Sequence, residues 1–159
     1  MDNVIYTGIF IDHRLLLDEL YAHNPSIARL GRLEKVLSSN YISVAFRPEE
    51  GDAESHKKFF GKRIILKLVG YGRDDSNEGL KAEIHPTGDE ELDYILRAVA
   101  DPVIPISTSA KGLAKNTKTL KFWSLFNPIM IEGVYAGVDS KGKMIGVDDG
   151  KVPDTHESK

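Results

Sequence analysis

Strand-like stretches recur along this sequence, and polar or glycine-containing segments separate them. The expected strands are Val4–Ile11, Tyr41–Phe46, Lys62–Gly72, Gly79–Pro86, Val103–Ser109, Ile129–Val138 and Lys143–Val147. The polar segment RDDSNE, between Gly72 and Gly79, predicts an antiparallel hairpin with a longer loop. Gly70 and Gly72 predict a bulge or the end of a strand. The order of these strands and of the polar segments between them favours an antiparallel sheet.

Other segments space their apolar residues as amphipathic helices do. Asp12 is expected to cap a helix that begins at His13 and stops at Asn24-Pro25. Ser26 is expected to cap a second helix over residues 26–37, and acidic residues at the start of residues 88–101 predict a further one. A short helical turn is expected over residues 55–61. Strands and helices together predict an α+β fold with an antiparallel sheet and peripheral helices.

The length and composition limit the class of protein. A chain of 159 residues can bury a core of its own, so we expect a single domain over residues 1–147 and a flexible C-terminal tail over residues 148–159. The sequence has no cysteine, which excludes thiol catalysis, iron–sulfur clusters and cysteine-based zinc sites. A cytoplasmic location is the expectation for such a composition.

The charge balance excludes a general polyanion binder. The chain has 21 basic and 24 acidic residues, for a net charge of −3, so any polyanion site has to be local. The N-terminal stretch does not have the pattern of a signal peptide, and no apolar run approaches the roughly 18 residues of a membrane span, so no membrane partner is expected. The five histidines are scattered, and neither a metal site nor a cofactor is expected.

Two of the expected strands resemble each other. NYISVAF, from Asn40 to Phe46, and VIPISTS, from Val103 to Ser109, both interleave apolar residues with hydroxyl side chains. Alternation along a strand places every second side chain on the same face. The hydroxyl side chains are either ordinary residues of these strands, or they line two strands that face each other across one site.

The segments YTGIF, YISVAFRP, ILKLVGYGRDD, IPISTSAKGLAKNTKTL and IEGVYAGVDSKGKMI occur in that order from about Tyr6 to Ile145. In order and character they resemble the two-histidine (2H) phosphoesterase superfamily, and more narrowly its RNA-repair and tRNA-ligase cyclic-phosphodiesterase branch. The resemblance implies a bilobal fold in which each lobe contributes a strand with a His-x-Thr or His-x-Ser motif to a central cleft. In that family one imidazole activates the attacking group, the other protonates the leaving oxygen, and the hydroxyls hold the phosphate.

This sequence departs from the pattern at both histidines. The first triplet is Tyr41-Ile42-Ser43, and the second is Pro105-Ile106-Ser107 or, in another register, Val103-Ile104-Pro105. Tyrosine has an ordinary pKa of about 10 and is a poor general base at neutral pH, while proline and valine transfer no protons. We therefore expect a cleft with no catalytic residue.

The resemblance and the nearby cations give a set of candidate ligand-binding residues. They are Tyr41, Ser43, Arg47, Ser107, Thr108, Lys111 and Lys115. The lysines belong to the basic run SAKGLAKNTKTLK, which also contains Lys118 and Lys121; it is either a solvated loop or a cationic rim. Arg47 is expected to act from the opposite wall, where its planar guanidinium suits a phosphate.

Three functions follow from these expectations. The leading hypothesis is a catalytically degenerate protein that binds a nucleotide, a cyclic nucleotide signal or an RNA end in its cleft without hydrolysis. The first alternative is an active phosphodiesterase that acts on 2′,3′-cyclic phosphates or cyclic oligonucleotides. The second is a scaffold that uses the fold for its shape, with an apolar surface patch in place of a ligand site.

Overall fold

The computed structural model describes residues 4–46 and 55–145. Its elements are β1 (Val4–Ile11), α1 (His13–His23), α2 (Pro25–Leu30), β2 (Lys35–Val36), β3 (Asn40–Phe46), β4 (Arg63–Arg73), β5 (Asn77–Ile84), α4 (Glu90–Arg97), β6 (Val103–Thr108), the 3-10 helix η1 (Ala114–Thr119), β7 (Phe122–Asp139) and β8 (Met144–Ile145). Arg47 and the expected tail over residues 148–159 lie outside the described residues.

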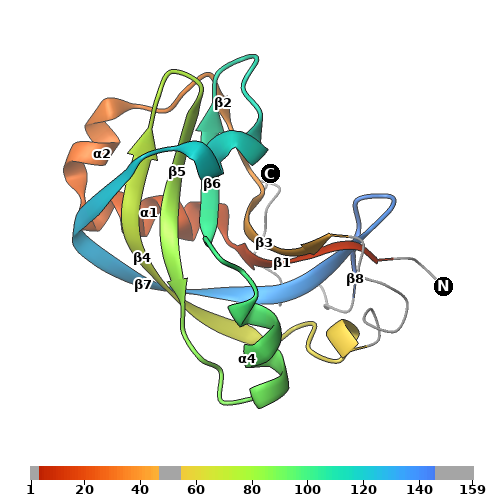
Figure 1. Cartoon of the computed structure of the whole chain (residues 1–159). Coiled ribbons are helices and arrows are strands. Elements are labelled where there is room, and N and C mark those ends of the chain that lie inside the picture. The colour runs from red at the N-terminus through yellow and green to blue at the C-terminus, as the bar shows by residue number, and fades with distance from the viewer. Residues whose placement is uncertain (1–3, 47–54, 146–159) are drawn as a thin grey trace.

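The described strands form one eight-stranded sheet with the order β2-β6-β5-β4-β7-β1-β3, in which β8 pairs with β7 (Figure 1). Every pairing in it is antiparallel. The predicted α+β class and the predicted β4–β5 hairpin are therefore confirmed. The register of β4 shifts between Leu68 and Gly70, which confirms the bulge expected near Gly70.

The sheet bends so far that its two ends approach each other. β3 and β6 lie at or next to opposite ends of the strand order, yet the Asn40 Nδ2 donates a hydrogen bond of 2.9 Å to the carbonyl of Pro105. The backbone N–H of Leu37 donates to the carbonyl of Ile106 at 2.8 Å. These contacts bring together the two strands that the sequence marks as a matched pair.

One face of the sheet carries the main core, and helices cover it. Leu16 and Leu20 of α1, Ile27 of α2 and Leu92 and Leu96 of α4 pack into this core with the inward side chains of the strands. Burying a side chain of this size contributes about 1.5–3 kcal/mol to the stability of the fold. No helix within residues 4–46 and 55–145 is both long enough and apolar enough to cross a membrane.

The start of α1 is predicted correctly, and the extent of α2 is not. The Asp12 carboxylate accepts hydrogen bonds from the backbone N–H groups of Arg14 and Leu15, as an N-cap does. The second helix, expected over residues 26–37, ends instead at Leu30, because Gly31 adopts a left-handed φ of 73°. Asn24 rather than Ser26 stands at its cap position, and the chain beyond Gly31 runs extended into β2.

Candidate ligand cavity between β3 and β6

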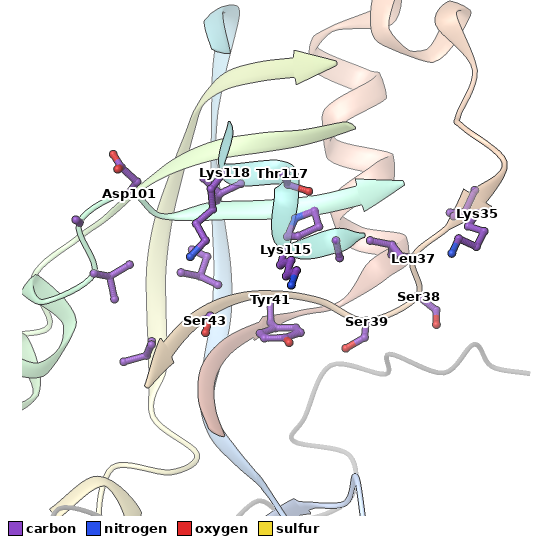
Figure 2. Close-up of a pocket in the computed structure, with 18 of the residues that line it drawn as sticks. Lys35, Leu37, Ser38, Ser39, Tyr41, Ser43, Asp101, Lys115, Thr117 and Lys118 are labelled. Carbon is purple, nitrogen blue, oxygen red and sulfur yellow. The ribbon is translucent and has the colours of Figure 1, made fainter. Parts of the chain in front are cut away.

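A cavity of about 1000 Å³ lies between β3 and β6 (Figure 2). β3, the linker before it, the segment after α4, β6 and η1 surround this space. The described residues that line it, with backbone or side-chain atoms, are Lys35, Val36, Leu37, Ser38, Ser39, Tyr41, Ile42, Ser43, Val44, Ala98, Val99, Ala100, Asp101, Val103, Pro105, Ala114, Lys115, Thr117 and Lys118.

β3 borders the cavity with its free edge. It pairs with β1 on one side, and within the described residues no strand pairs with its other side. Strand alternation turns Ile42 into the core and leaves Ser43 exposed. Because the edge itself faces the cavity, residues from both faces of β3 line it.

The ring of Tyr41 is held by other aromatic rings. It stacks on Phe10 with ring centroids 4.8 Å apart and on Tyr6 with centroids 5.4 Å apart. Burial and the neighbouring Tyr41 hydroxyl raise the pKa of Tyr6 to about 12. The position of the Tyr41 ring at the border of the cavity is therefore fixed.

β5 positions the lysines of η1. The Asn77 side-chain amide donates to the carbonyl of Leu113 at 2.8 Å and to the Thr117 hydroxyl at 3.3 Å. Gly79 lets η1 approach closely, since a Cβ atom on this residue would lie 2.3 Å from the Thr117 Cγ2. These contacts bring Lys115 and Lys118 to the rim of the cavity.

Positive charge dominates the lining. Among the lining residues that the structure describes, three are lysines, Lys35, Lys115 and Lys118, and one is acidic, Asp101. Hydroxyl groups come from the exposed Ser38, Ser39 and Ser43, and the remaining walls are mostly aliphatic. No histidine is among the described lining residues, and no cluster of three potential metal ligands occurs within the parts of the chain that the structure describes.

The residues of β6, the strand with the second motif, are divided between the cavity lining and the interior of the protein. Val103 and Pro105 of β6 line the cavity, whereas Ser107 is fully buried. Ser107 pairs with Glu78 and Pro105 with Gly79, so Ile106 is an additional residue in β6 and forms a bulge. The bulge places the Ser107 side chain opposite the buried Glu78.

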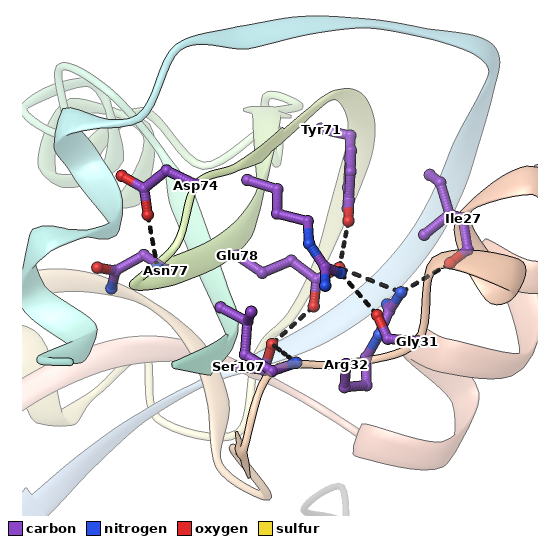
Figure 3. Close-up of polar contacts among 10 residues, drawn as sticks. Ile27, Gly31, Arg32, Tyr71, Asp74, Asn77, Glu78 and Ser107 are labelled. Atoms are coloured by element: carbon purple, nitrogen blue, oxygen red, sulfur yellow. Dashed lines mark hydrogen bonds and ion pairs between the residues drawn. The ribbon is translucent and has the colours of Figure 1, made fainter. Parts of the chain in front are cut away.

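Glu78 is the centre of a buried polar cluster (Figure 3). Ser107 donates to its Oε1 at 2.7 Å and accepts from the backbone N–H of Leu33 at 3.1 Å. Arg32 and Arg73 approach its Oε2 at 3.1 and 3.3 Å, and the Tyr71 hydroxyl donates to the same oxygen. This cluster, the Glu78 cluster, fixes the segment between α2 and β2, which leads to Lys35.

The structure brings part of the predicted site together. Tyr41, Ser43 and Lys115 line the cavity, facing Val103 and Pro105 of the second motif strand. Ser107 and Thr108 are buried outside the lining, and the exposed Lys111 is not part of it. Arg47 lies outside the described residues.

Sequence reasoning missed several lining residues, namely Lys35, Ser38, Ser39 and Asp101. Lys35 was expected within a helix, and Gly31 was the signal that could have ended that helix earlier. Asp101 follows α4 in a segment without a recognisable motif.

The chain matches no protein-family model, and no curated protein matches it significantly.

Proposed function

We propose that this protein binds a phosphate-bearing ligand of the nucleotide class in the cavity between β3 and β6 and does not hydrolyse it. The observation that carries the proposal is the lining itself, in which three lysines face one acid beside Tyr41 and Pro105. The 2H resemblance assigns the catalytic histidines to Tyr41 and to Pro105 or, in the other register, Val103. The two-lobed 2H arrangement is part of this proposal.

The mixed lining supports a ligand that is anionic at one part and flat or apolar at another. Lysine ammonium groups and hydroxyls are suited to phosphate oxygens. The aliphatic side chains Val36, Val44, Val99 and Val103 offer surface to a base, and the ring of Tyr41 offers a stacking partner. A nucleotide combines both kinds of group.

The same lining argues against hydrolysis. No described lining residue is a histidine, so none carries an ordinary pKa near neutrality. General acid and general base each contribute about 10² to 10⁴ to a rate, so the loss of both removes most of the catalysis that a 2H enzyme uses.

Calorimetry tests the binding. The panel is AMP, 2′,3′-cyclic AMP and an RNA oligonucleotide with a 3′-phosphate, titrated into the wild-type protein, Lys115→Gln and Lys111→Gln. We expect binding that Lys115→Gln weakens and that Lys111→Gln, outside the lining, leaves unchanged. If no member of the panel binds at millimolar concentration, the scaffold function replaces this proposal.

Chromatography of 2′,3′-cyclic AMP after incubation with the protein tests the absence of hydrolysis. We expect no AMP product above the background without protein. Turnover at ordinary enzyme rates that Tyr41→Phe abolishes would establish the phosphodiesterase alternative.

A further inference from the structure

The cavity is larger than one nucleotide requires. Its volume of about 1000 Å³ stands at the upper end of the range of roughly 300–1,000 Å³ for small-molecule sites. A single nucleotide would leave much of this space to water. The size therefore favours a ligand with more than one base or more than one phosphate.

The cations lie apart from one another. Figure 2 shows Lys35 at one side of the cavity, Lys118 toward the other and Lys115 between them. Lys35 belongs to β2, whereas Lys115 and Lys118 belong to η1. Each wall is fixed by its own contacts: β2 pairs with β6, and Asn77 holds η1 against β5. The cations of the two walls therefore do not gather at one point of the lining.

Hydrogen-bonding groups are also spread along the cavity. Ser38 and Ser39 lie in the linker that follows Lys35, and Ser43 lies on β3. The free edge of β3 adds backbone polar groups to the cavity. The arrangement suits an elongated anion whose negative charges are separated.

From the volume and from this separation we infer that the ligand contains two phosphates, as in a phosphodiester-linked dinucleotide, with one phosphate near Lys35 and the other near Lys115 and Lys118. This inference rests on the proposed function and makes its ligand more specific. Linear and cyclic dinucleotides share the relevant chemistry.

Calorimetry with AMP, the linear dinucleotide pApA and cyclic di-AMP tests the inference. The proteins are the wild type, Lys35→Gln, Lys118→Gln and, as a control outside the lining, Lys111→Gln. Each exposed lysine tolerates the neutral substitution, and a thermal melt verifies the fold. We expect at least one dinucleotide to bind tenfold or more tightly than AMP, and the stronger of the two identifies the linear or the cyclic form.

The variants locate the two phosphates. For the dinucleotide, Lys35→Gln and Lys118→Gln should each weaken binding and each make the affinity less dependent on salt concentration. For AMP, only one of the two should weaken binding, because one phosphate occupies one end of the cavity. Lys111→Gln should change none of these quantities by a comparable amount.

Two results would overturn the inference. If AMP binds as tightly as both dinucleotides, or if Lys35→Gln leaves dinucleotide binding unchanged, the ligand does not span the cavity, and the proposed nucleotide function stands without this extension. If neither AMP nor a dinucleotide binds the wild-type protein, both proposals fail.

Discussion

Ser43 and Ser107 occupy the third position of two similar triplets and have opposite surroundings. Ser43 is exposed at the edge of β3 and lines the cavity. Ser107 is fully buried and bonded to Glu78 and to Leu33. The difference arises from one additional residue in β6, which shows that a motif in a strand sets the direction of a side chain only while the pairing with the neighbouring strand stays regular.

The largest effect should come from Glu78→Ala. The substitution removes the carboxylate that Arg32 and Arg73 share and leaves the buried Arg32 guanidinium without its counter-ion. Removing one partner of a buried ion pair costs about 3–5 kcal/mol. Urea unfolding measures the loss, with Glu83→Ala as the control, an exposed carboxylate of the same strand. Equal stability of the two variants would mean that the Glu78 cluster contributes nothing to the fold.

Ser107→Ala and Ser43→Ala should separate stability from binding. Ser107→Ala removes a hydrogen bond to a buried carboxylate, and we expect a loss of about 1.5–3 kcal/mol in the free energy of unfolding. Ser43→Ala should change this free energy by less than about 0.5 kcal/mol, because the side chain is exposed.

The losses of ligand affinity in these two variants should have the opposite order. Ser43→Ala should weaken binding of the nucleotide ligand about tenfold, whereas Ser107→Ala should leave it nearly unchanged at temperatures where the variant is folded. Urea unfolding and calorimetry on both variants check the pair. A larger loss of affinity in Ser107→Ala would place that hydroxyl in the site after all.

Gly79→Ala should disturb both regions through η1. The new methyl group would collide with Thr117 Cγ2, and overpacking of this kind costs about 1–3 kcal/mol. Because η1 carries Lys115 and Lys118, the displacement should also weaken ligand binding. Thr117→Ser removes the colliding methyl group and keeps the hydroxyl that Asn77 contacts, so the double variant should regain part of both losses. If the losses of the two single variants simply add in the double variant, the expected contact between the new methyl group and Thr117 is contradicted.

The smallest effect concerns alkaline pH. Burial, followed by the hydrogen bond to Glu78, raises the pKa of Tyr71 to about 12. The unfolded chain loses this proton near pH 10, so the stabilising contribution is complete below pH 10 and disappears as the pH rises through about 12. Urea unfolding between pH 9 and 12 should show the decline, and Tyr71→Phe should make it shallower. An identical pH dependence in the variant would assign the decline to other groups, including Tyr6 and Tyr135, whose pKa values also rise to about 12.

Local patterns predicted much of the fold. The β4–β5 hairpin, the Asp12 cap and the strands of the matched pair follow from signals within a few residues. The strand β2 depends on contacts distant in sequence, because Leu33 is bonded to Ser107 and Lys35 pairs with Thr108. Periodicity alone could not reveal these contacts.

The same distinction applies to the candidate site. Tyr41, Ser43 and Lys115 could be named because their strands and the basic run are visible in the sequence. The burial of Ser107 could not be predicted, because it depends on the bulge in β6 and on the charge of Glu78. A hydroxyl opposite a buried carboxylate donates its hydrogen bond to that carboxylate. Only the register of the two strands shows that Ser107 and Glu78 lie opposite each other.

The place of β1 in the sheet has a consequence for the order of folding. β1 lies between β3 and β7, and its Thr7 pairs with Gly137. A ribosome adds about 5–20 residues per second, so β1 waits on the order of ten seconds for this partner to be synthesised. Contacts of such long range close late and slow the folding of a chain. β3 pairs with β1, and its Asn40 is bonded to Pro105 of β6, so the wall that carries Tyr41 and Ser43 reaches its final position only after β6 and β7 are synthesised.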